Sequence, residues 1–237
     1  MAYIEYNGKR SDELGLRLTN HREIKTSARD YDLIEIKGVD GAYTQDNDRL
    51  KTVEHEFYFS LNKEVVPSVS EISNWINQSV GFKECRLSWD EDFIYYGQSQ
   101  GSASVTEILK KFGKVRVKFI FHPVKYSKEE THSIGTSLTF NNEGQVKIHP
   151  IITLTGANDV TLSINGRKLE FRGIQDNLTI DAKKWMVYRT ERQTKVSDWR
   201  KMLLTPESER PYLDVGKNVI TVSSGNATMT TRMGWMI

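Results

Sequence analysis

The sequence predicts a mainly β fold of the α+β class with one helix, and three segments support that prediction. Residues 53–59 and residues 114–122 each alternate apolar and polar side chains. Successive side chains of a strand point to opposite faces, so a period of two gives each of these strands one apolar face. Between them, the apolar residues from 69 to 80 recur at helical spacing, which predicts a single helix.

The helix is expected over Ser68–Ser79. Ser68 and, three residues later, Glu71 form a capping-box pattern directly after a proline, which is typical of a helix start. Two weaker alternating segments, Tyr31–Lys37 and Cys85–Trp89, are expected to be further strands.

A polar segment without periodicity, Lys125–Ser133, predicts a linker between two domains, which we expect at 1–133 and 134–237. The second domain has short apolar runs separated by turn residues. Its clearest signal is Asn165-Gly166 between two such runs, because both residues of a tight hairpin turn need positive φ. Short strands at regular spacing predict a β-sandwich for this part of the chain.

Composition and charge exclude several classes of protein. The 237 residues include 33 basic and 31 acidic ones, and a formal net charge of +2 removes the simplest argument for a nucleic-acid binder. The longest apolar run is far shorter than the roughly 20 residues that a membrane span needs. The single cysteine, Cys85, can form no internal disulfide. We expect a protein that is made in a cytosol, folds without disulfides and inserts into no membrane.

The residue patterns predict no catalytic, cofactor or metal site. No two of the five histidines have a metal-ligand spacing, and His55 is expected in the core on the apolar face of its strand. The acidic runs Asp90–Asp92 and Gln45–Asp48 lack the further oxygen ligands of a calcium loop, so both are expected to be exposed turns or loops. No phosphate-binding loop or nucleophile elbow is present. A binding or assembly protein, and not an enzyme, is the resulting expectation.

Short signals follow one another along nearly the whole chain in a distinctive order. In the first part they are Leu14–Leu18, Ile34–Gly41, the predicted helix, Arg86–Tyr96 and a strand ending at Phe119–Pro123. In the second part they are Ile151–Thr155, the Asn165-Gly166 hairpin, Leu178–Asp181 and Pro211–Ile220. This order resembles the distal tail proteins of siphophages that infect Gram-positive bacteria. The resemblance implies an N-terminal β-sandwich-like belt domain with one helix, followed by a galectin-like β-sandwich.

The resemblance also implies an assembly role. Members of the family form a hexameric ring through their belt domains, between the tail tube and the tail-tip or tail-associated proteins, with DNA passing through the lumen only in transit. Receptor-binding or baseplate proteins attach around the periphery in some phages. A closed ring uses a head-to-tail interface, and unpaired strand edges are natural surfaces for it. The expected location is therefore the phage tail tip of the virion.

Two groups of residues are singled out on this basis. We expect the tight turns of the fold at Gly38, Asp40, Gly41, Asn165, Gly166, Gly216 and Asn218. Candidate surfaces for the contact between copies are the loop Ala42–Leu50, the predicted helix and the strand Gly113–Phe121. The individual interface candidates are Asp46, Asp48, Arg49, Arg116 and Lys118.

Two other functions stay open as alternatives. The first is a carbohydrate-binding adsorption module that recognises host cell-wall glycan. A galectin site needs a histidine, an arginine pair and a stacking tryptophan in fixed order, and no arginine cluster follows His149 at that spacing. The second is a cell-wall hydrolase, which needs a carboxylate pair or a metal site that the sequence does not display.

Overall fold

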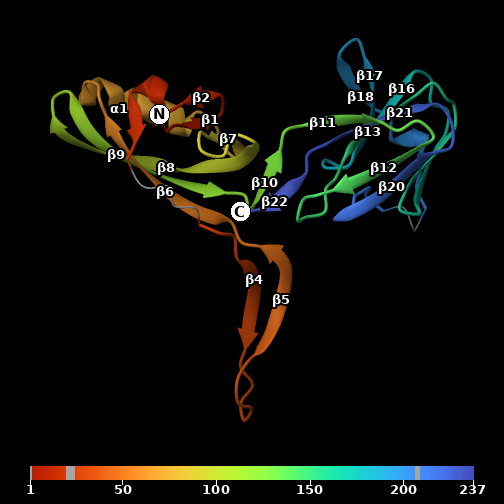
Figure 1. The fold of residues 1–237 in the computed structure, drawn as a ribbon, viewed down its shortest axis with the longest axis horizontal. Coiled ribbons are helices and arrows are strands. Elements are labelled where there is room, and N and C mark those ends of the chain that lie inside the picture. Colours follow the sequence, from red (N-terminus) through yellow and green to blue (C-terminus); the bar gives the residue numbers. More distant parts are fainter. Residues whose placement is uncertain (1, 20–24, 206–208) are drawn as a thin grey trace. The chain divides into compact units, whose positions relative to one another are not determined.

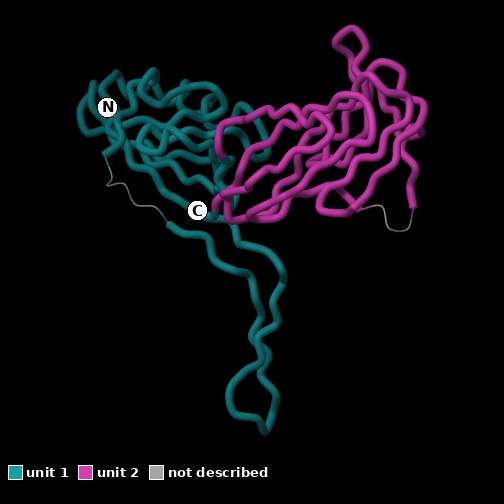
Figure 2. Tube along the Cα trace, turned by 45° about the vertical axis from the view of Figure 1, so that its right-hand side comes forward, with its two compact units in different colours: residues 1–126, 236–237 teal, residues 127–235 magenta. Residues whose placement is uncertain are grey.

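The computed structural model describes residues 2–19, 25–205 and 209–237, which form mostly strands and one α-helix (Figure 1). The predicted mainly β fold class is confirmed. The chain divides into two compact units (Figure 2), which we call unit 1, residues 1–126 and 236–237, and unit 2, residues 127–235.

The segment predicted as an irregular linker contains two short strands, β10 (Val124–Ser127) and β11 (Glu130–Ser133). The division between the units falls between Tyr126 and Ser127, ahead of the predicted boundary after Ser133. The absence of apolar alternation is misleading here, because a strand that pairs through its backbone can carry polar side chains on both faces.

Unit 1 is built on a nine-stranded sheet whose main path runs β2-β1-β7-β8-β9-β6-β3, with β10 and β22 completing it. The strands of this sheet are β1 Ile4–Tyr6, β2 Lys9–Arg10, β3 Leu16–Leu18, β6 Val53–Leu61, β7 Lys83–Leu87, β8 Phe93–Leu109, β9 Phe112–Phe121, β10 and β22 Gly234–Met236. Of β10 and β22, only residues 124–126 and Met236 belong to unit 1. Burial alternates along β6 and β9, as their period-two patterns predict. A short 3₁₀ turn, Asp12–Leu14, precedes β3.

The helix α1 spans Val65–Asn77 and so begins before the predicted start. Ser68 is not its N-cap: it lies in the first turn, where its hydroxyl donates a hydrogen bond to the carbonyl of Glu64 at 2.7 Å. Pro67 also lies in the first turn, and its missing N–H is tolerated there because the first backbone N–H groups of a helix have no intrahelical acceptor. The capping-box prediction was therefore wrong.

An aromatic cluster joins α1 to the sheet of unit 1. The ring of Phe119 on β9 lies 5.1 Å from that of Tyr6 and 5.8 Å from that of Phe57. Trp75 of α1 meets Tyr6 edge to face at 6.3 Å, and its indole N–H donates to the carbonyl of Lys9 at 3.2 Å. All four rings are almost fully buried, so they hold the helix against one face of the sheet.

A separate two-stranded sheet, which we call the arm, consists of β4 (Arg29–Ile34) and β5 (Tyr43–Leu50) (Figure 1). The stretch predicted as an exposed loop, Gln45–Asp48, is exposed, but it is part of β5. The register pairs Tyr31 with Asp46 and Ile34 with Tyr43. The polar composition of β5 concealed this strand, because its stability comes from pairing with β4.

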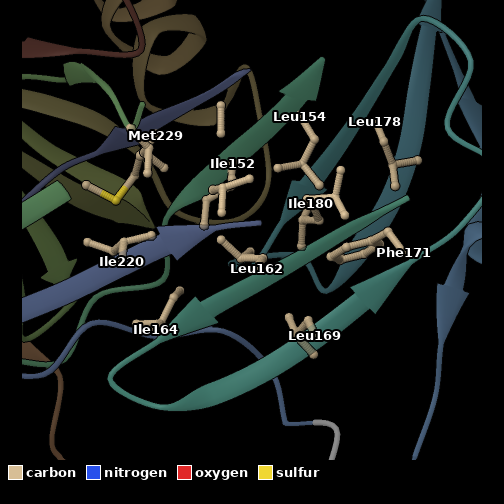
Figure 3. Packing of buried hydrophobic residues seen from close by; sticks show 14 of the residues in the cluster. Ile152, Leu154, Leu162, Ile164, Leu169, Phe171, Leu178, Ile180, Ile220 and Met229 are labelled. Carbon is tan, nitrogen blue, oxygen red and sulfur yellow. The ribbon is translucent and has the colours of Figure 1, made fainter. Parts of the chain in front are cut away.

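Unit 2 is a β-sandwich of two antiparallel sheets, ordered β11-β21-β13-β16-β17-β18 and β12-β20-β14-β15-β19. Besides β11, the strands are β12 Ser137–Asn142, β13 Ile151–Thr155, β14 Val160–Ile164, β15 Arg167–Phe171, β16 Asn177–Asp181, β17 Met186–Glu191, β18 Thr194–Ser197, β19 Met202–Leu203, β20 Gly216–Val222 and β21 Asn226–Thr231. A 3₁₀ turn, Trp199–Lys201, precedes β19. Its core lies between the sheets: Leu154 and Ile180 of one layer face Leu162 and Phe171 of the other (Figure 3).

Candidate assembly surfaces

The arm exposes apolar side chains along both of its strands. Leu33 is 62% exposed, and Tyr31, Ile34 and Tyr43 are also exposed. A protein rarely leaves several large apolar residues of one element in water without a partner, so this concentration is typical of an interaction surface. The weak alternation of residues 31–37 had suggested an ordinary half-buried strand. In the structure most side chains on both faces of this hairpin are exposed to solvent.

Ion pairs connect residues of the two strands of the arm near its root. Asp30 is nearly buried, and its carboxylate lies 2.6 Å from Arg49 Nε and 3.2 Å from Lys51 Nζ. Arg29 lies 2.5 Å from Asp46 and 3.5 Å from Asp48. The hydrogen bond from Arg49 lowers the pKa of Asp30, and that from Arg29 lowers the pKa of Asp46.

These contacts give three of the predicted interface residues, Asp46, Asp48 and Arg49, partners within their own chain. With these paired residues included, the outer arm is acidic: residues 31–48 contain five acidic residues and one lysine.

The tip of the arm is a turn around Gly38–Gly41. Gly38 and Gly41 have φ values of 88° and 87°, which residues with a Cβ adopt only at a cost, and Asp40 lies exposed between them. The N–H of Val39 donates to the carbonyl of Ile36 at 3.1 Å, and both side chains are about half exposed. The tip therefore presents two further apolar side chains.

The other two interface candidates lie on β9, on the face opposite the core. Arg116 Nε is 3.3 Å and Lys118 Nζ 4.0 Å from the same carboxylate oxygen of Glu56 on β6. The hydroxyl of Tyr58 donates to the other oxygen of Glu56, and this hydrogen bond is the main reason that the pKa of Glu56 is lowered. Residues 110–118 contain five basic residues and no acidic one, so this strand and the turn before it are strongly basic. No described ion pair joins this basic strand to the arm of the same chain.

A third surface, formed by α1 and the distal half of β8, is almost free of charge. Residues 65–82 contain one charged residue, Glu71, and residues 93–109 contain one, Glu107, although 27% of the chain is charged. The two segments belong to adjoining elements, since Gly101 of β8 lies beside the side chain of Asn77. Depletion of charge is a mark of the centre of protein interfaces.

In the described residues, the strand pairs of the same half of β8 leave one of its edges without a partner. β7 pairs only with residues 95–97, whereas the described partners of residues 103–109 are all in β9. Leu109, at the end of this strand, is 68% exposed. An unpaired strand edge presents N–H and C=O groups that a neighbouring chain can satisfy.

Three of the predicted turn residues of unit 2, Asn165, Gly216 and Asn218, belong to one hydrogen-bonded network, which we call the node. Asn165 and Gly166 turn between β14 and β15 with φ values of 51° and 85°, and Gly216 has φ of 84°. Asn218 was expected in a tight turn, but it has no positive φ, lies within β20 and is completely buried. Its amide oxygen accepts from Asp214 N and from the Asn165 side chain, both at 2.8 Å.

The amide nitrogen of Asn218 completes the node. It donates to the carbonyls of Asp214, at 2.9 Å, and Gly216, at 2.8 Å. Asn165 in turn accepts from Val219 N at 2.8 Å. Asn218 therefore fixes the loop before β20 by side-chain hydrogen bonding and not by adopting a turn conformation.

The described residues hold no group of three or more His, Cys, Asp or Glu side chains that could bind a metal ion. Cys85 is buried in unit 1, and loss of solvation raises the pKa of its thiol far above the ordinary value, which makes it a poor nucleophile. His55 is buried on the core face of β6 and packs against Phe57, with ring centroids 4.3 Å apart. In the described part of the chain, no helix is long and apolar enough to cross a membrane.

The fold of the two units, a β-rich unit with one helix followed by a β-sandwich, is that of phage distal tail and baseplate hub proteins. The chain matches the SPP1 Dit protein, described as a paradigm of the hub adsorption apparatus in phages that infect Gram-positive bacteria. The TM-score is 0.83 at 15% identity, with 100% of both chains covered. The predicted resemblance is confirmed as a likeness of fold.

Two further structures match with lower scores. Both are of the phage P2 baseplate in its activated conformation. The form with Ca gives a TM-score of 0.55 at 10% identity, and the form with Sr gives 0.53 at 11% identity, each with 97% of both chains covered. No protein-family model and no curated protein sequence matches this chain.

Proposed function

We propose that this protein is the distal tail hub of a siphophage, a virion component without enzymatic activity. It forms a hexameric ring that joins the tail tube to the tail-tip or baseplate and host-adsorption proteins. The observation that supports this most strongly is the match to SPP1 Dit over the whole of both chains. The match covers both units, so the proposed role belongs to the whole chain and not to one domain.

The sheet of unit 1 has the asymmetry that a ring requires. A ring forms when one surface of each copy meets a different surface of the next and the rotation closes. The unpaired edge of β8 is one such surface, and β3 is the last described strand at the far side of the same sheet. Pairing between these two sides satisfies backbone groups of β8 and buries the uncharged surface beside it.

Charge complementarity assigns the arm a neighbour. The acidic outer arm, residues 31–48, matches in sign the basic strand and turn at residues 110–118. We therefore place Asp46 and Asp48 of one copy near Arg116 and Lys118 of the next. Charged rims of this kind set orientation and association rate more than affinity, and salt screens them. The apolar side chains of the arm supply the burial that holds the contact.

The mass of the full chain in solution, measured by light scattering over a wide concentration range, tests the ring. We expect a species of six times 27.3 kDa at high concentration. If the chain stayed monomeric at every concentration and also with its tail-tip partner present, the ring proposal would be refuted. Assembly by unit 2 alone would refute the assigned interface.

Charge reversal tests the interface more sharply. Arg116→Glu with Lys118→Glu is expected to shift assembly to higher concentration, and Asp46→Lys with Asp48→Lys in the same chain is expected to restore part of the loss. The matched control is Lys168→Glu with Lys217→Glu, the same charge change on exposed residues of unit 2. An equal effect of the control would mean that net charge, and not this interface, governs assembly.

The proposed partners follow from the ring. They are the tail tube protein on one side, tail-tip or tail-associated proteins on the other, and receptor-binding or baseplate proteins around the periphery. DNA would pass through the lumen without being held.

The alternative of carbohydrate binding by unit 2 has less support. A sugar site uses an aromatic ring exposed as a stacking platform, but the strongly exposed large apolar residues among residues 127–205 and 209–235 are all aliphatic. Trp185 and Trp199 are only partly exposed, and both pack against the core. Their two rings meet edge to face, with centroids 5.3 Å apart. Titration of the full chain with cell-wall glycan, followed by tryptophan fluorescence, is expected to show no binding.

A further inference from the structure

Ile237, the last residue of the sequence, belongs with Met236 to unit 1, although residues 127–235 belong to unit 2. Its backbone is hydrogen bonded on both sides. The N–H of Ile237 donates to the carbonyl of Pro123 at 3.0 Å, and its carbonyl oxygen accepts from the N–H of Ser27 at 2.6 Å. Pro123 follows β9 and Ser27 precedes β4, so one residue connects the end of a central strand with the root of the arm.

The side chain of Ile237 is anchored as well. It packs against the hydrophobic core of unit 1 and lines a small cavity of about 30 Å³. Apolar side chains form most of its other walls, among them Val53, Phe57 and Phe121, and the polar side chains of Lys25 and His55 also line it. The cavity is mainly apolar, so burial of the isoleucine side chain contributes to holding this end of the chain in place.

Ser27 is next in the chain to the first residue that is hydrogen bonded across the base of the arm. That residue is Ala28, whose carbonyl accepts from Lys51 N at 2.8 Å, and the pairing of Arg29 with Leu50 follows. An isolated two-stranded ribbon is marginally stable in water, so the direction of the arm depends on how its root is held. Ile237 supplies one such attachment by joining Ser27 to the core of unit 1.

We propose that Ile237 is a positioning residue for the arm. Its backbone holds the root at Ser27, and its side chain holds that backbone in the cavity of unit 1. The inference about the arm root concerns a single chain. Its consequence for assembly rests on the proposed ring: an arm with a fixed root loses less conformational freedom when it docks on the next copy.

Hydrogen exchange of the full chain, at a concentration at which it is monomeric, tests the attachment. In Ile237→Asp, which places a charge in the apolar cavity, the amides of Ser27 and the first residues of the arm are expected to exchange roughly tenfold faster. Ile237→Ala is expected to give a smaller effect in the same direction. The amides of β6 and β9 are expected to keep their protection, which reports that unit 1 remains folded. Met236→Ala is the matched control, since Met236 is adjacent and exposed.

Equal exchange at Ser27 in the aspartate variant, the control and the unaltered chain would overturn the proposal. Mass measurements on the same variants keep this inference distinct from the ring. If the unaltered chain is hexameric and no variant changes exchange, the attachment is wrong and the ring stands. If the unaltered chain is monomeric throughout but Ile237→Asp accelerates exchange at Ser27, the attachment stands and the ring fails. If both hold, Ile237→Asp is expected to need a roughly tenfold higher concentration to assemble.

Discussion

Replacing Asn218 by alanine is expected to be the most damaging polar substitution in unit 2. The side chain is fully buried and makes four hydrogen bonds, with Asp214 N, the Asn165 side chain and the carbonyls of Asp214 and Gly216. Alanine removes both the donor and the acceptor, and it leaves four polar groups in part-buried surroundings without this partner.

The expected loss is about 3 kcal/mol of the free energy of unfolding. A net contribution of about 1 kcal/mol per hydrogen bond gives an upper figure near 4, and a buried group left without a partner costs roughly 1 to 3. Entry of a water into the space left by the amide lowers the sum. Since domains of this size are stable by about 5 to 15 kcal/mol, the loss is a large fraction of the total. It corresponds to a fall of roughly 10 °C in the melting temperature of unit 2.

Calorimetry and urea unfolding of the full chain measure this loss. The matched control is Asn141→Ala, because Asn141 is exposed on the neighbouring strand β12, opposite Lys217. We expect a change of less than about 0.5 kcal/mol in the control. Equal stability of Asn218→Ala and the control would refute the reasoning that this amide fixes the loop before β20.

Other expected results concern titratable groups. Burial raises the pKa of the Cys85 thiol. At pH 8 this thiol is expected to react with a thiol reagent roughly a hundredfold more slowly in the native chain than in urea. Fast labelling of the native chain would contradict its burial. Burial lowers the pKa of His149 below its ordinary 6.5. The neutral side chain therefore contributes to the free energy of unfolding above pH 6.5, and this contribution is lost as the pH falls below that value. Stability measured against pH is expected to flatten there in His149→Gln. The pKa of Glu56 is lowered, mainly by the hydrogen bond from Tyr58. The ionised carboxylate therefore contributes to the free energy of unfolding above its ordinary pKa of 4.5, and this contribution is lost at more acid pH. Glu56→Gln is expected to weaken the acid dependence of unfolding, whereas an unchanged acid limb would mean that this carboxylate contributes nothing.

The strands of the two cores were predictable because their pattern is local. Alternation over residues 53–59 and 114–122 requires no knowledge of what each strand pairs with, since a period of two by itself makes one apolar face. The hairpin at Asn165-Gly166 was equally local, because positive φ at two successive positions is a property of those two residues. The mainly β class, the single helix and the sandwich all follow from such signals.

The elements that the sequence misplaced depend on contacts with distant residues. Ser68 has the sequence features of an N-cap, but packing of α1 on the sheet extends the helix back to Val65. The strand β5 has few residues that favour strands, and it exists because β4 pairs with it. The candidate interface residues Asp46 and Arg49 were found as charges in a polar loop, and the structure gives them partners within the arm.

The sequence by itself determined the fold class; it also predicted a two-part organisation and displayed no recognisable catalytic motif. Each is a matter of periodicity, turn chemistry or residue type, which a single chain carries along its length. Only the tertiary structure decided that residues 29–50 form an exposed arm, that Asn218 is a buried hydrogen-bonding node and that Ile237 belongs to the first unit. These features join residues far apart in the chain, and their free energy depends on burial and pairing geometry that no local pattern records.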